Sequence, residues 1–288
     1  MWIQRLLRHL LTLLLTALLG GLLGATLMRL APGFGVDERE LDTRLSEQSL
    51  QVLRHSRANE RNILRFYAQY LRGIIHGDLG VSPSLGRPVA ELFSERAPVT
   101  LRSVALGLLE GWLLGFALAL PGVMWRGWAY DLLASVVGGI FVCLPSAVLA
   151  MLFLYVGGPG SLPIALVVFP RIFRYSRNLL LQTYSLPHVL TAKAKGLHST
   201  RILLWHVLPS AAPPLLALVG VSVSMAFGAA IPIEVICDSP GIGKLAWQAA
   251  LGRDLPLLVN ITIFVTLLTL TANSFSDLIG KAFAKQPT

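Results

Sequence analysis

Long uncharged runs separated by short polar links dominate the pattern of this 288-residue chain. The runs cover residues 10–28, 103–125, 132–170, 207–233 and 255–276, and only the second contains a charge, Glu110. A helix needs about 20 apolar residues to cross the hydrocarbon core of a bilayer. The third run is too long for one span, and the glycine- and proline-rich residues 157–161 divide it in two. The pattern therefore predicts an all-α polytopic membrane protein with six transmembrane helices.

The composition supports this class. Hydrophobic residues make up 54% of the chain and charged residues 14%, whereas a soluble domain of this size carries about 25% charged residues. The net charge of +9 does not indicate a nucleic-acid-binding protein, because the basic residues are distributed around the spans. The basic residues of the two termini and of the links after spans two and four fall on one side, so the positive-inside rule predicts that both termini are cytoplasmic. Residues 29–96 also hold ten arginines, but with nine acids, and long segments are weak determinants of topology.

The regions outside the spans differ in character. The first run is longer than a signal-peptide core, so we expect an uncleaved first helix within residues 1–31. Residues 32–102 form an extracytoplasmic segment in which apolar positions at 62–75 recur with helical spacing, typical of an amphipathic helix. A second short helix is expected at 89–96. Residues 103–283 form a five-helix core with a cytoplasmic loop at 185–209.

The fourth span is short in apolar residues. Its helix has to continue from residue 161 to about 180, which brings Arg171, Arg174 and Arg177 to its inner end, where they can snorkel to the interface. We interpret this helix as one that continues into the cytoplasm.

Glu110 is the only acid within the apolar runs, and an intramembrane carboxylate is a candidate for lining a pathway. The alternative is a carboxylate that pairs with a group of a partner subunit or lies near a wet cavity. Prolines inside spans three and five, Pro145, Pro213, Pro214 and Pro232, are compatible with kinked helices around a pathway or with irregularity that has no function.

The cytoplasmic loop has the most distinctive pattern. It predicts a helix, a glycine turn at Gly196 and a second helix, with Pro209 at the start of the next span. Ala192 and Ala194 are small enough to let another protein approach closely, and Lys193 and Lys195 offer positive charge to an acidic rim. The candidate coupling residues are Thr191, Ala192, Lys193, Ala194, Lys195, Gly196, Leu197, His206 and Pro209.

This Ala-x-Ala-x-Gly core, followed by Leu208-Pro209, resembles the "EAA" coupling loop of ABC-importer permeases. Several further segments resemble the dipeptide/oligopeptide/nickel branch of that family: residues 29–33, 70–71, 77–82, 87–89, 96–101, 239–243 and 252–256. In the last two, Pro240, Gly241, Gly243, Arg253 and Asp254 match the family's outer loop. The resemblance extends from residue 5 to about residue 280.

The resemblance implies a type I ABC-importer permease fold in the bacterial inner membrane. It implies three kinds of protein partner besides the lipid bilayer: a second homologous permease, two cytoplasmic ATPase subunits with their ATP and magnesium, and an extracytoplasmic binding protein. The cargo would be di- or oligopeptides, with nickel chelates, glutathione or antimicrobial peptides as alternatives. Three features depart from the family: His206 replaces an aliphatic residue, the link at 157–161 is short, and residues 34–60 match poorly.

The chain is not expected to be an enzyme or to bind a cofactor or metal itself. Residues 241–244 resemble the end of a phosphate loop, but Asp238 and Leu245 stand where that motif needs Gly and Ser or Thr. The six histidines show no metal-ligand spacing. A stand-alone secondary transporter would show inverted repeats, and a membrane enzyme would cluster nucleophiles or bases near one face. The sequence favours neither.

Overall fold

A computed structural model describes residues 11–12, 15–16, 18–24, 26–27, 67, 72–74, 76–125 and 127–284. The exit from the first span at 29–33, residues 34–60 and most of the expected amphipathic helix at 62–75 lie outside the described residues. The chain forms two compact units, each treated separately below. One comprises Met1–Ala97 with Leu245–Leu267, and the other comprises Pro98–Lys244 with Leu268–Thr288.

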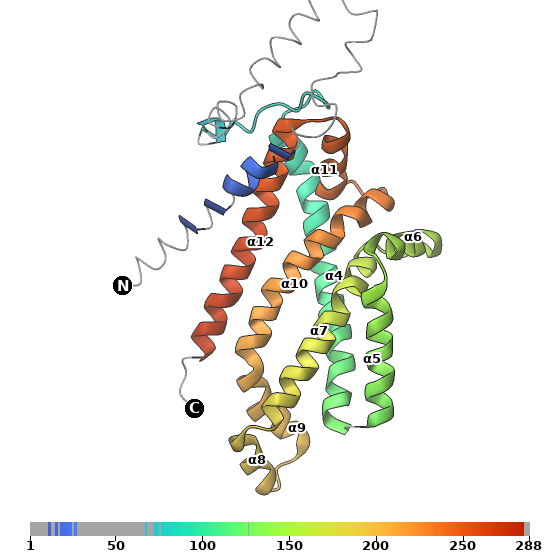
Figure 1. Cartoon of the computed structure of the whole chain (residues 1–288), viewed down its shortest axis with the longest axis vertical. Helices are drawn as coiled ribbons and strands as arrows, with labels where there is room; N and C mark the ends of the chain where they lie inside the picture. The colour runs from blue at the N-terminus through green and yellow to red at the C-terminus, as the bar shows by residue number, and fades with distance from the viewer. Residues whose placement is uncertain are drawn as a thin grey trace, which may run out of the picture. The chain divides into compact units, whose positions relative to one another are not determined.

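The described chain is helical, with a single isolated β-bridge between Val81 and Pro88. From residue 89 onward the helices, labelled in Figure 1, are α4 (Val89–Trp125), α5 (Trp128–Cys143), α6 (Ser146–Val156), α7 (Ser161–Tyr184), α8 (Pro187–Ala194), α9 (Ser199–Ile202), the π-helix η2 (Leu203–Val207), α10 (Leu208–Ile236), α11 (Ile242–Leu251) and α12 (Leu255–Ala284). The short helix expected at 89–96 is not separate, because α4 continues through Pro98 without a break.

Three helical segments of the described chain are long and apolar enough to cross a bilayer: Val89–Met124, Ser199–Ile236 and Leu255–Gly280. The second of these joins α9, η2 and α10 into one helix of 38 residues. A fourth span is present if the bent pair α5 and α6 counts as one. The multi-pass membrane character is therefore confirmed, whereas the count of six helices and the side of each terminus stay predictions.

The third predicted span is not one straight helix. It breaks between α5 and α6 at Leu144 and Pro145, and the two helix axes are bent by 98°. Proline lacks an N–H group and disfavours helical geometry in the residue before it, and Leu144 is accordingly extended. Pro145 thus produces a sharp break where the hydrophobic pattern alone predicts a continuous span.

Within the second unit, α7 lies in the core and packs against α5, α6 and α10. Helix α4 approaches α7 closely because Gly107, Gly111 and Gly115 recur every four residues on one face. A Cβ atom at Gly107 would lie 2.8 Å from the Ile164 side chain, and one at Gly115 would lie 2.7 Å from that of Ile172. Small residues at this spacing let membrane helices pack with their backbones close together. The four-residue spacing of these glycines is visible in the sequence, but the sequence analysis did not identify it.

Replacing Gly115 with alanine is expected to lower the free energy of unfolding by about 1–3 kcal/mol, the usual cost of overfilling a packed core. The added methyl group would also meet the backbone nitrogen of Phe173 at 3.2 Å, which cannot rotate away. Thermal unfolding of the purified protein in detergent measures the effect. Gly139→Ala is the control, because a Cβ there meets nothing within 4 Å. Equal stability of the two variants would contradict close α4–α7 packing.

Candidate functional site

The 185–209 loop is a compact arrangement of two short helices. Helix α8 begins with Pro187, which is favourable at the first helical position. It ends at Ala194 with Lys195 as its C-cap, and the next residue, Gly196, has a φ of +75°, in the left-handed region where residues with a Cβ are disfavoured. Helix α9 follows, capped by His198, whose ring nitrogen accepts a hydrogen bond from the Thr200 N–H. The helix–glycine turn–helix predicted from the sequence is therefore present.

Ala192 does not form the surface for close approach of another protein that the sequence predicted. It is 4% exposed and belongs to a buried cluster with Val189, Leu180, Tyr184 and other residues of α7, α9, η2 and α10. Its small side chain lets α8 pack against the chain's own helices rather than against another protein. The expectation that Ala192 forms an approach surface for a partner was wrong, whereas Ala194 is exposed.

The remaining loop residues fall into two groups. Thr191, Lys193, Lys195, Gly196 and Pro209 are exposed, and Leu197 and His206 are half-buried. The Lys193 ammonium lies 4.9 Å from the centre of the Tyr184 ring, within the range of a cation–π interaction. Three apolar side chains that the sequence analysis did not single out are also well exposed: Leu190, Leu204 and Trp205, the last at 74%.

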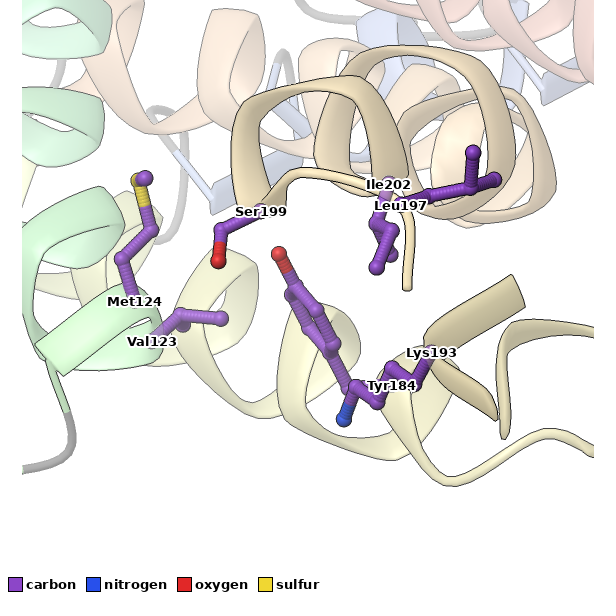
Figure 2. Close-up of a pocket in the computed structure, with 7 residues that line it drawn as sticks. All are labelled: Val123, Met124, Tyr184, Lys193, Leu197, Ser199 and Ile202. Atoms are coloured by element: carbon purple, nitrogen blue, oxygen red, sulfur yellow. The ribbon is translucent and has the colours of Figure 1, made fainter. Parts of the chain in front are cut away.

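A cavity of about 220 Å³ opens behind the loop. It is lined by Val123, Met124, Tyr184, Lys193, Leu197, Ser199 and Ile202, from α4, α7, α8 and α9 and the turn between the last two. Figure 2 shows the hydroxyl groups of Tyr184 and Ser199 pointing into the same space. The end of α4 and the loop helices both line this cavity, although Val123 also packs in the same buried cluster as Val189 and Ile202.

The far end of α10 carries a buried carboxylate that the sequence analysis missed, since it took the apolar run to end at residue 233. Glu234 is 2% exposed and accepts hydrogen bonds from the Thr100 hydroxyl (2.6 Å), the Gly243 N–H (2.6 Å) and the Lys244 N–H. Thr100 in turn accepts from the Ile242 N–H at 2.7 Å. Glu110 is therefore not the only acid within a span helix.

The geometry of this cluster explains two of the outer-loop glycines. A Cβ on Gly241 would overlap the Glu234 carboxylate, and one on Gly243 would lie 2.6 Å from the Ile231 backbone. Every group that contacts the carboxylate is a donor, and two of them, the N–H groups of Gly243 and Lys244, belong to the first turn of α11. Pro240, by contrast, is exposed. The cluster fixes the end of α10 to the start of α11 and to α4.

Asp254 organises a similar cluster in the first unit. It is 1% exposed, and its carboxylate accepts hydrogen bonds from the hydroxyls of Ser82 and Ser84 and from the Leu257 N–H at 3.0 Å. The last contact caps the N-terminus of α12. Arg253, beside it, is exposed and has a φ of +51°. Nearby, Glu95 and Glu91 raise the pKa of the Arg87 guanidinium by hydrogen bonding.

Glu110 and the arginines of α7 differ in their polar contacts. Glu110 is half-buried, accepts a hydrogen bond from the Ser161 hydroxyl at 3.0 Å, and has a second oxygen that is buried with no partner among the described residues. Arg177 does not snorkel freely, because it forms a two-pronged ion pair with Asp131 of α5, at 3.1 and 2.6 Å. Arg171 and Arg174 are exposed.

Neither cysteine is paired in a disulfide. Cys143 is exposed, and the Cys237 thiol lies 3.8 Å from the Ala150 carbonyl oxygen, with burial raising its pKa. Among the described residues, no group of three or more His, Cys, Asp or Glu side chains is arranged to hold a metal ion.

Comparison with known proteins identifies similar chains. The family model described as "binding-protein-dependent transport system inner membrane component" matches residues 111–287. A putative peptide permease protein of Brucella suis is 28% identical over 282 residues, covering 88% of each chain. The oligopeptide transport system permease protein AppB of Bacillus subtilis is 26% identical over 249 residues (74% of this chain, 78% of AppB).

Two further comparisons extend these findings. The glutathione transport system permease protein GsiC of Escherichia coli is 23% identical over 253 residues, covering 82% of this chain and 83% of GsiC. Among solved structures, an inward-facing form of the MetNI methionine ABC transporter matches with a TM-score of 0.60 at 18% identity, covering 67% of this chain and 96% of the matched chain. At that identity the match shows the fold alone.

Proposed function

This chain belongs to the family of binding-protein-dependent transport system inner membrane components, as its sequence suggested, and from that premise we propose that it is the permease subunit of an ATP-driven peptide importer. It would pair with a second, related permease, and the cargo would pass between the two. Two separate ATPase subunits would bind the 185–209 loops, and a binding protein would deliver the peptide. The similarity to peptide and oligopeptide permeases supports this cargo.

The observation that carries the proposal is the placement of the loop at the start of a long helix. Helix α9 continues through η2 into α10, so the segment Ser199–Ile236 is one helix of 38 residues. Movement imposed on the loop would therefore reach the far end of α10, about 55 Å away at 1.5 Å per residue. The exposed side chains of Leu190, Leu204 and Trp205, beside Lys193 and Lys195, support a protein partner at this end.

In this proposal the switch between inward-facing and outward-facing states is a population shift that ATP drives. ATP binding would bring the two ATPases together, and the loops of the two permeases would follow. The cavity lined by Val123 and Ser199 would let α8 and α9 shift relative to the end of α4. Glutathione is a second candidate cargo, which the similarity to GsiC supports.

Reconstituting the chain in vesicles with its partner permease, ATPases and binding protein tests the proposed function. We expect uptake of a labelled peptide that requires ATP, the ATPases and the binding protein together. Competition with unlabelled glutathione separates the two candidate cargoes. Transport by the purified chain alone, driven by an ion gradient without any ATPase, would instead support a secondary transporter and contradict the proposal.

A further inference from the structure

A second cavity in the same unit lies against the break between α5 and α6. Its volume is about 250 Å³, and its lining includes Phe141, Ser146, Val167, Arg171, Met225 and Gly228. The walls come from the end of α5, the start of α6 and the middle segments of α7 and α10. Arg171 is the only charged residue in this lining. The cavity therefore places one cationic side chain against a largely apolar wall.

The ion pair of Arg177 and Asp131 shows how deep Arg171 lies. Helices α5 and α7 pack side by side in opposite directions, and this pair joins the first turn of α5 to α7 (Figure 1). The chain has no charge from residue 132 to residue 170, so Asp131 marks one edge of the apolar layer. Arg171 precedes Arg177 by six residues on α7. At 1.5 Å per residue, it therefore lies about 9 Å deeper in the apolar layer than Arg177 does.

Helix geometry favours an Arg171 side chain that leans away from that edge. Side chains in an α-helix point toward the N-terminus, and the N-terminal end of α7 is the end away from Arg177. The cavity lining agrees, because it includes Val167, one turn before Arg171. The cavity lining favours this direction over the inward snorkelling expected from the sequence, which for Arg171 stays a prediction.

Arg171 has no hydrogen bond or ion pair with any part of the chain that the structure describes, and it is exposed. A guanidinium at this depth is costly to place against lipid tails, so it has to face water or a polar group. Lipid headgroups lie at the membrane surfaces, not within the apolar layer. The face of the subunit that holds this cavity therefore borders water or a polar group from outside the described chain.

We propose that this cavity is a subsite for the carboxylate of the transported peptide, with Arg171 as the residue that binds it. The inference rests on the proposed function, since it assigns one end of the peptide cargo to one side chain. A guanidinium donates two parallel N–H groups that match a carboxylate. The apolar walls of Phe141, Val167 and Met225 suit the neighbouring side chain of the peptide. A Cβ on Gly228 would meet nothing within 4 Å, so the glycine keeps the cavity open.

The test compares uptake of a tripeptide with a free C-terminal carboxylate and of its C-terminal amide, in vesicles that contain the complete transporter. The binding protein is the same and saturating in every assay, so its own preference cancels between variants. We expect Arg171→Gln to lower the ratio of acid to amide uptake by about tenfold or more, the usual effect of losing a charged hydrogen bond. Amide uptake should stay near the wild-type rate.

Arg174→Gln is the matched control, because Arg174 is exposed on the same helix and does not line the cavity. It should leave the ratio unchanged. Gly228→Leu should slow uptake of the acid, since it adds a bulky side chain at the cavity wall. If Arg171→Gln fails to assemble, Arg171→Lys keeps the charge without the two-pronged geometry and should give an intermediate ratio.

The outcomes separate the two levels of inference. A wild-type complex that transports both peptides, with an unchanged ratio in the Arg171 variants, would overturn the subsite and leave the proposed function standing. A wild-type complex that transports neither peptide would contradict the proposed cargo and this subsite with it.

Discussion

Substituting Gly196 with valine is expected to abolish transport while the transporter still inserts and assembles. Gly196 has a φ of +75° in the turn between α8 and α9, and a β-branched residue strongly disfavours that conformation. The strain, about 1–3 kcal/mol, would be relieved by reorienting the short helices because the turn is exposed and a Cβ there meets nothing within 4 Å. The measurement is peptide uptake and ATP hydrolysis by the same reconstituted vesicles, with hydrolysis retained and uptake lost.

Gly157 provides the matched control for this prediction. It has a φ of +76°, an open surrounding and an exposed position, but it lies in the turn before α7 rather than in the 185–209 loop. Gly157→Val imposes the same backbone strain at another place and should leave transport coupled. Wild-type uptake by the Gly196 variant would contradict the assignment of the loop. An equal loss of peptide uptake in both variants would show that backbone strain alone causes the effect.

Replacing Glu234 with alanine is expected to lower the free energy of unfolding by about 3 kcal/mol or more. The change leaves the Thr100 hydroxyl and the Gly243 and Lys244 N–H groups without their acceptor, and each buried unsatisfied group costs about 1–3 kcal/mol. Glu234→Gln should be intermediate, because its amide keeps one acceptor oxygen but turns a donor toward another donor. Thermal unfolding in detergent measures both variants.

Asp238→Asn is the control for the Glu234 variants. Asp238 forms an ion pair with Lys244 at 2.6 Å, but its side chain is 86% exposed, and exposed pairs contribute about 0–1 kcal/mol. Asparagine also tolerates the φ of +52° at this position. If Glu234→Ala proved as stable as Asp238→Asn, the buried cluster would not hold the end of α10 to α11.

The features that depend on local sequence were predictable. Gly196 forms the turn, residues 157–161 separate α6 from α7, and α10 begins next to Pro209, because glycine and proline restrict the backbone where they stand. The prolines within spans were interpreted as kinks, and Pro145 does break its span, but the angle of 98° follows from packing that no local rule contains. The glycines at 107, 111 and 115 were readable as a packing face.

The features that depend on distant contacts were not predictable from the pattern. The sequence analysis ended the fifth apolar run at residue 233, before its first charge, so Glu234 was missed. Its burial depends on backbone N–H groups that become donors only once α11 starts beside it. Ala192 was misinterpreted for a related reason. A small residue suits close approach, but the pattern does not say whether the approaching surface belongs to a partner or, as here, to the chain itself.

The π-helix η2 has a further consequence for the 185–209 loop. A π-turn accommodates one more residue than an α-turn, and each residue turns an α-helix by about 100°. The additional residue in Leu203–Val207 therefore sets the rotational phase between α9 and α10. Without it, the same side chains of α9 would face a direction about 100° away relative to the membrane helix that they precede. The direction in which α9 faces relative to α10 is thus determined by one inserted position in η2, within the loop.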